Sequence, residues 1–191
     1  MTTVDSPKAG AYPDPGSDRG PTDPVTAEVV RSAMETVCFE MATYVSRTAT
    51  TPILNQSNER NATVLDSTGR LAALSVGIPQ FMLTSTLPVR FALEFFGEEL
   101  SPGDVIVAND PYHGGGHLPD FNVFAPVFAG DELVLIASIQ CHHGDTGGAV
   151  PGGYNNHAAD IWSEGIRYPV TAARRMKRTC SAHGWRQTIV M

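Results

Sequence analysis

The first periodic pattern along the chain is helical. Apolar side chains recur every three or four residues, at Val30, Ala33, Met34, Val37, Met41 and Val45. This spacing places them on one face of a helix. Asp23 is a suitable N-cap, and Pro24 suits the first helical position, where a missing N–H costs nothing. The sequence therefore predicts an amphipathic helix from Pro24 to about Ser46.

Further along, short strand-like runs appear together with one more helical segment. Runs at 62–65 and 71–74 flank a turn-forming Asp-Ser-Thr-Gly sequence and predict a hairpin. A second helix is predicted over 83–96 and ends at Gly97; Pro88 suits its first turn, which moves the start toward Thr86. Further strands are predicted at 104–108, 121–128 and 132–140, with a tight turn at 129–131.

Helices and strands that come in blocks favour an α+β fold. We expect a mixed or antiparallel sheet with packed helices and with glycine-rich loops at the strand ends. The sequence shows no internal repeat that would indicate a solenoid.

Composition divides the chain into three parts. The first 24 residues hold five prolines and three glycines, so residues 1–22 are expected to form a disordered leader. Residues 23–170 are expected to form the folded domain. Residues 171–191 are an atypical tail with five basic and no acidic residues. This tail is interpreted as a solvated basic segment, an anion-binding arm, or the product of a reading-frame shift or truncated gene near Ala172.

The overall charge and hydropathy exclude several classes of protein. The net charge of −7 argues against nucleic acid or an anionic membrane as the partner. No apolar run approaches the ~20 residues of a membrane span, and no signal-peptide pattern begins the chain, so the expected location is the cytoplasm. The three scattered cysteines form neither a disulfide framework nor a zinc motif. Cys141 is interpreted as a small buried residue rather than a nucleophile.

The candidate chemistry lies in two loops that follow predicted strands. Residues 109–120 read NDPYHGGGHLPD, and residues 141–148 read CHHGDTGG, so each loop contains a His-x-x-Asp sequence. A third such sequence, at 157–160, is expected to face solvent. Imidazole nitrogens and a carboxylate are ligands for a divalent ion such as Mn, Zn or Fe. The predicted hairpin brings the two loops together, so the expected metal ligands are His117, Asp120 and His142.

Neighbouring polar residues receive accessory roles in this interpretation. His143 is expected to move a proton near neutral pH, and Asp145 to orient His142. The candidate substrate contacts are Asn109, Asp110 and Tyr112. The glycine runs are not followed by the Gly-Lys-Ser/Thr of a phosphate-binding loop, so no nucleotide site is predicted in this chain.

At these loops the sequence resembles the hydantoinase B family, the B-type subunits of ATP-dependent N-methylhydantoinases. Related chains occur in 5-oxoprolinases and in acetone and acetophenone carboxylases. The resemblance spans about residues 23–170, and its main motifs lie at 109–112, 115, 117–120, 142–148, 151–152 and 160–167. It implies a manganese-type centre at His117, Asp120 and His142. It also implies an A-type partner subunit of actin-like fold, which binds ATP and phosphorylates a carbonyl or enol oxygen.

The resemblance predicts an N-terminal fragment of a B-type subunit. The enzyme would hydrolyse a cyclic amide such as hydantoin or 5-oxoproline, or carboxylate a ketone. Family chains continue far beyond this length, so the alternatives are a non-catalytic truncated remnant and a fragment that only binds the partner subunit. A 2-His-1-carboxylate iron oxygenase uses the same ligand types and is a further alternative.

Overall fold

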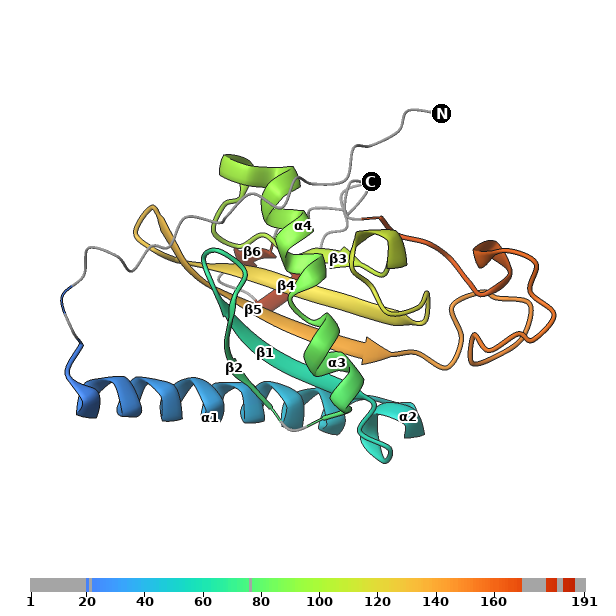
Figure 1. Cartoon of the computed structure of the whole chain (residues 1–191), viewed down its shortest axis with the longest axis horizontal. Coiled ribbons are helices and arrows are strands. Elements are labelled where there is room, and N and C mark those ends of the chain that lie inside the picture. Colours follow the sequence, from blue (N-terminus) through green and yellow to red (C-terminus); the bar gives the residue numbers. More distant parts are fainter. Residues whose placement is uncertain (1–19, 21, 76, 170–177, 182–183, 188–191) are drawn as a thin grey trace.

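A five-stranded antiparallel sheet lies between two layers of helices in the computed structural model of the chain (Figure 1). The structure describes residues 20, 22–75, 77–169, 178–181 and 184–187. Most of the predicted leader, 1–22, and part of the basic tail, 171–191, lie outside the described residues. The division of the chain into leader, domain and tail stays a prediction.

The sheet confirms the expected α+β class and its antiparallel form. Its strand order is β2-β1-β5-β4-β3, and every neighbouring pair is antiparallel. The strands are β1 (Arg60–Asp66), β2 (Leu71–Leu74), β3 (Ile106–Ala108), β4 (Asp120–Ala129) and β5 (Glu132–His142). Both predicted hairpins, β1–β2 and β4–β5, are present. β4 and β5 extend one and two residues further toward the candidate site than the sequence predicts.

The first helix, α1 (Pro24–Thr48), begins where the sequence predicts. The Asp23 side chain accepts a hydrogen bond of 2.9 Å from the Thr26 N–H, which satisfies one of the free donors at the helix start. The helix packs on the face of the sheet formed by β1 and β2, and its first turns extend past these strands (Figure 1). The short helix α2 (Pro52–Asn55) follows it.

The buried stripe of α1 is rotated from the predicted one. Cys38 and Ala42 are buried, whereas Val30 and Val37 are 50% and 45% exposed. The sheet covers only the side of α1 on which Cys38 and Ala42 lie. The apolar cluster between α1 and the sheet consists of Met34, Cys38, Val64, Ala73 and Leu135.

The helix predicted over 83–96 is α4 (Leu87–Phe96), and a separate short helix, α3 (Pro79–Thr84), precedes it. The break has a local cause, because Pro88 has no N–H to donate to the carbonyl of Thr84 and instead occupies the first turn of α4. The structure therefore confirms the start near Thr86. Gly97 ends α4 with a φ of 49°.

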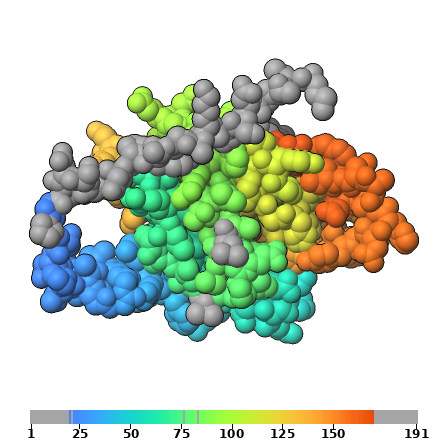
Figure 2. Space-filling view, viewed as in Figure 1, coloured from blue at the N-terminus to red at the C-terminus, as the bar shows by residue number. Residues whose placement is uncertain are grey.

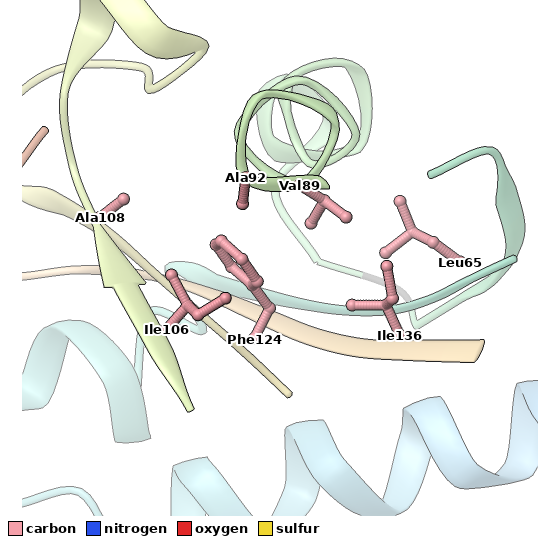
Figure 3. Close-up of a cluster of buried hydrophobic side chains, with 7 residues drawn as sticks. All are labelled: Leu65, Val89, Ala92, Ile106, Ala108, Phe124 and Ile136. Carbon is pink, nitrogen blue, oxygen red and sulfur yellow. The ribbon is translucent and has the colours of Figure 1, made fainter. Parts of the chain in front are cut away.

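The main apolar core lies between α4 and the sheet. Val89 and Ala92 of α4 face the strands, as Figure 3 shows. The other buried members of this cluster are Leu65, Ile106, Ala108, Phe124 and Ile136. This core fixes β4 and β5 beside each other.

Two short strands lie in the region where the sequence shows no periodicity. β6 (Arg178–Ser181) and β7 (Gly184–Gln187) form a separate antiparallel pair. Among the described residues, no helix combines the length and apolar character that a membrane crossing requires.

Candidate metal centre

The β4–β5 hairpin brings Asp120 and His142 together. Asp120 is the first residue of β4, His142 is the last of β5, and the two are direct partners across the ladder. His117 reaches the same place through the turn that precedes β4, in which the Asp120 N–H donates to the His117 carbonyl over 2.8 Å. The residues chosen from the sequence as metal ligands are therefore neighbours in space.

Three potential ligand atoms of this triad converge within hydrogen-bond distance. His117 Nε2 lies 3.0 Å from Asp120 Oδ1, His142 Nδ1 lies 2.9 Å from the same oxygen, and the two nitrogens are 3.1 Å apart. The two imidazole rings are nearly parallel, at 12°, with centroids 5.0 Å apart. The arrangement thus offers three lone-pair donors to one point.

Burial and charge set the protonation of the triad. The Asp120 side chain is 0% exposed, His142 is 7% exposed and His117 is 18% exposed, so solvent reaches the centre past His117. Burial raises the pKa of the Asp120 carboxyl, but hydrogen bonds from His117 and His142 outweigh it and hold this pKa below its ordinary value. The hydrogen bond to Asp120 raises the pKa of His142. Asp120 is therefore the anionic group of the centre.

The donor set of two imidazole nitrogens and one carboxylate oxygen suits a divalent ion. The three atoms lie 2.9 to 3.1 Å apart, and each nitrogen is within hydrogen-bond distance of Asp120 Oδ1. The second carboxylate oxygen, Asp120 Oδ2, is buried and has no hydrogen-bond partner among the described residues. An ion held by these three atoms would leave coordination positions for other ligands.

The loop that carries His117 approaches the carboxylate too closely for any residue larger than glycine. A Cβ atom added to Gly116 would lie 2.5 Å from Asp120 Oδ2. Gly116 therefore lets the backbone next to His117 lie against the buried oxygen.

The candidate substrate contacts differ sharply in exposure. Asn109 and Asp110 are buried, at 0% and 1%, whereas Tyr112 is 69% exposed. The Asn109 amide donates to the carbonyls of Leu118 and Ile166, over 2.6 and 2.7 Å. Its oxygen accepts from the Tyr168 N–H over 2.6 Å. Asn109 and Asp110 use their polar atoms inside the protein, and the role of all three residues in substrate binding stays a prediction.

Asp110 links the first loop to the segment near residue 167. Its Oδ2 accepts from Arg167 over 2.7 Å and contacts His113 Nδ1 at 2.5 Å. The Arg167 guanidinium lies 5.3 Å from the centre of the Tyr112 ring and 5.6 Å from that of Trp162. Figure 2 shows the segment after β5, in orange, packed beside the loop that precedes β4. These contacts hold the two segments together at the end of the sheet that carries the triad.

The Asp110 contacts predict a pH-dependent stability. Burial raises the pKa of Asp110, but hydrogen bonds from Arg167 and His113 outweigh it and hold this pKa below its ordinary value. A lowered folded-state pKa contributes stability that is present above the unfolded value of about 3.9 and is lost as the pH falls through the folded value. We expect the difference in unfolding free energy between the unmodified chain and Asp110→Asn to be constant above about pH 5 and to shrink below about pH 4. Urea denaturation across this range measures it, and a difference that is independent of pH would contradict the assignment.

In the part of the chain that the structure describes, neither of the two predicted catalytic residues makes a side-chain hydrogen bond to the triad. His143 follows His142, and its ring packs edge-on against Phe121, with centroids 5.2 Å apart. Burial lowers the pKa of His143. Asp145 is exposed, and its carboxylate accepts from the Gly147 N–H over 2.8 Å. Within the described residues, Asp145 makes no hydrogen bond to His142, which is oriented by Asp120 instead. The catalytic roles of both residues stay predictions.

Cys141 and the third His-x-x-Asp sequence lie in the environments that the sequence predicts. Cys141 is half-buried, and burial raises the pKa of its thiol to about 11, so it is protonated at neutral pH. His157 and Asp160 are exposed, and the Asp160 carboxylate accepts from the Ser163 N–H over 3.3 Å. The third His-x-x-Asp sequence thus faces solvent, as expected.

Sequence reasoning missed a row of buried carboxamides beside the triad. Asn61, Gln140 and Asn122 are direct partners across β1, β5 and β4, two residues further along the strands than the Asp120–His142 pair. Each is 1% exposed, and each has a side-chain nitrogen without a partner among the described residues. Asn122 and Gln140 share the β4–β5 hairpin, but Asn61 comes from β1, whose pairing with β5 the sequence does not predict. The protein interior behind the triad is therefore polar.

Sequence reasoning also missed Tyr154, whose ring lies over the histidine pair. Its ring centroid is 5.2 Å from that of His117 and 6.4 Å from that of His142. The available signal was weak, because it consists only of an aromatic residue that follows Pro-Gly-Gly in a loop.

Comparisons with known proteins identify a family that matches most of the chain. The family described as hydantoinase B/oxoprolinase matches residues 23–189, through most of the basic tail. The chain is 36% identical over 148 residues to caprolactamase subunit beta of Pseudomonas jessenii. The aligned region covers 77% of this chain and 25% of that protein. It is also 32% identical over 129 residues to 5-oxoprolinase 1 of Arabidopsis thaliana, and this alignment covers 68% of this chain and 10% of that protein.

A solved structure shares the fold. The crystal structure of the ATP-dependent caprolactamase from Pseudomonas jessenii superposes with a TM-score of 0.74 at 32% identity, over 87% of this chain and 28% of that one. The chain thus spans about a quarter or less of the length of these relatives.

Proposed function

Since this chain belongs to the hydantoinase B/oxoprolinase family, we propose that it provides the metal-binding part of a B-type subunit in an enzyme that hydrolyses a cyclic amide with ATP. The observation that carries the proposal is the convergence of His117 Nε2, Asp120 Oδ1 and His142 Nδ1 within 3.1 Å. The names of the relatives, an ATP-dependent caprolactamase and a 5-oxoprolinase, support the reaction class.

In this proposal the triad holds Mn, Zn or Fe as a divalent ion. When bound, such an ion polarises a carbonyl oxygen or lowers the pKa of a bound water molecule. Asp120 supplies the negative charge, because its carboxylate is buried and stays ionised. His143 is the candidate proton carrier, because burial favours its neutral imidazole, which can accept a proton at neutral pH. We also assign a catalytic role to Asp145, because it lies in the loop that follows His142.

The proposal places ATP on a partner. Caprolactamase subunit beta is by its name one subunit of an assembly. We assign the ATP-binding role to an A-type subunit and the substrate role to a small molecule that binds beside the triad. Because this chain spans at most 28% of the relatives named above, turnover belongs to the complete assembly.

The direct test is the metal content of the purified 191-residue chain. After treatment with a chelator and dialysis against Mn²⁺, the chain is expected to retain one ion, measured by elemental analysis. At a free ion concentration 100 times the dissociation constant, binding to the folded state adds about 2.7 kcal/mol of stability, which a thermal melt detects. His157→Ala removes an exposed histidine outside the triad and should retain the same ion as the unmodified chain. A chain that binds no Mn²⁺, Zn²⁺ or Fe²⁺ would contradict the proposal and favour a fragment that only binds its partner.

A further inference from the structure

Tyr154 is an exposed aromatic residue held over the metal ligands. Its ring lies at 5.2 Å from the His117 ring with a tilt of 36°, and at 6.4 Å from the His142 ring with a tilt of 29°. It is nevertheless 74% exposed. One part of the ring therefore contacts the ligands, and most of its surface faces the solvent beside them.

The backbone fixes the position of Tyr154. Gly153 is buried with a φ of 69°, and a Cβ atom added to it would lie 2.3 Å from Cγ of Pro119. Pro119 lies between His117 and Asp120 in the sequence, so the loop of Tyr154 rests directly on the turn that carries two of the ligands. The Gly152 N–H donates to the Gly144 carbonyl over 2.6 Å. Gly144 is two residues from His142, so the loop is attached to both ligand-bearing segments.

The ring borders the side of the triad that solvent can reach. Asp120 and His142 are 0% and 7% exposed, and His117, the ligand closest to Tyr154, is 18% exposed. A molecule that approaches the centre past His117 therefore meets the Tyr154 ring. Aromatic rings stack on other flat groups at centroid separations of about 4.5 to 7 Å.

We propose that Tyr154 is a substrate-contacting residue whose ring forms one wall of the binding site and stacks on a flat group of the substrate next to the atoms bound at the metal. This inference rests on the proposed function, because it requires an ion at His117, Asp120 and His142. It adds a specificity-determining residue from a loop that supplies no ligand.

The test uses the full chain loaded with Co²⁺, whose absorption spectrum reports its ligands, and two chelating probes. Acetohydroxamate and benzohydroxamate carry the same chelating group, but only the second has a flat ring. In the unmodified chain we expect benzohydroxamate to bind more tightly than acetohydroxamate by about 2- to 10-fold, the range of a stacked aromatic pair. Tyr154→Phe should keep this preference, and Tyr154→Ala should remove it. All variants should bind Co²⁺ itself within about 2-fold of the unmodified chain, because Tyr154 supplies no ligand.

The controls separate this inference from the proposed function. Tyr44→Ala removes an equally exposed tyrosine, 70% exposed on α1, and should leave the preference unchanged. If Tyr154→Ala binds Co²⁺ normally and keeps the preference for benzohydroxamate, the inference is wrong and the metal centre stands. If the loaded chain binds neither hydroxamate, Tyr154 borders no exchangeable position and the inference is also wrong. If the unmodified chain binds no Co²⁺, both the inference and the proposed function fail.

Discussion

Replacing His142 with alanine is expected to lower the affinity of the chain for Mn²⁺ by more than about 100-fold. Even residues that only orient a metal ligand account for roughly 10- to 100-fold in affinity, so loss of a ligand should exceed this range. His142 is the more buried of the two histidines in the triad, at 7% exposed. Its Nδ1 lies 2.9 Å from Asp120 Oδ1 and 3.1 Å from His117 Nε2. Titration with Mn²⁺, followed by calorimetry, measures the change.

His143→Ala is the matched control for this variant. It removes the same type of side chain one residue away, where the ring packs against Phe121 rather than against the triad. The control should keep its affinity for Mn²⁺ within about 3-fold, since it removes neither a ligand nor a group that contacts one through its side chain. Circular dichroism checks that both variants are folded. Equal losses in the two variants, or none in His142→Ala, would overturn the assignment of His142 as a ligand.

Asn109→Ala should lower the unfolding free energy by about 3 to 5 kcal/mol, a large stability effect for one substitution. The variant leaves two carbonyls and one N–H, those of Leu118, Ile166 and Tyr168, without their partner. A buried group that loses its hydrogen bond costs about 1 to 3 kcal/mol. The bond to Leu118 is buried, and those to Ile166 and Tyr168 are partly buried. Asn109 is 0% exposed, so water does not replace the amide without rearrangement. Urea denaturation at neutral pH measures the loss.

Two further variants test whether the lost hydrogen bonds of Asn109 cause this destabilisation. Asn109→Asp keeps the shape but places a carboxylate oxygen against the carbonyls that now accept at 2.6 and 2.7 Å, so it should destabilise the chain at least as much as alanine does. Asn55→Ala removes an exposed asparagine whose amide donates to the Ala49 carbonyl over 3.2 Å, and should cost less than about 1 kcal/mol. A loss below 1 kcal/mol in Asn109→Ala would show that this residue does not hold the two segments together.

The elements that the sequence predicts well are those with a local cause. The start of α1 follows from Asp23 and Pro24, and the β4–β5 hairpin follows from two strand-like runs around a tight turn. The break between α3 and α4 has an equally local cause in Pro88, although the apolar pattern runs through it. The rotated buried face of α1 was not predictable in this way, because the position of the sheet decides which side of a helix is covered.

The triad was predictable because one hairpin connects its members. Asp120 and His142 stand at the two free ends of β4 and β5, so pairing the strands is enough to bring them together. His117 precedes Asp120 by three residues in a turn that contains Pro119. Asn109, Asp110 and Tyr154 depend instead on segments that are far apart or on loops without a regular pattern.

The sequence by itself determined the two hairpins, the α+β class and the set of residues that form the triad, because short-range turn and cap preferences fix the hairpins and one of these hairpins joins the triad. The pairing of β1 with β5 and of β3 with β4 came only from the tertiary structure. Only the tertiary structure decided that Asn109 and Asp110 are buried between two segments, that the Asp145 carboxylate accepts from the Gly147 N–H, and that the Tyr154 ring lies over the histidine pair. The physical reason is that a polar side chain hydrogen-bonds whichever group the packed chain places within reach, and the sequence does not specify that distance.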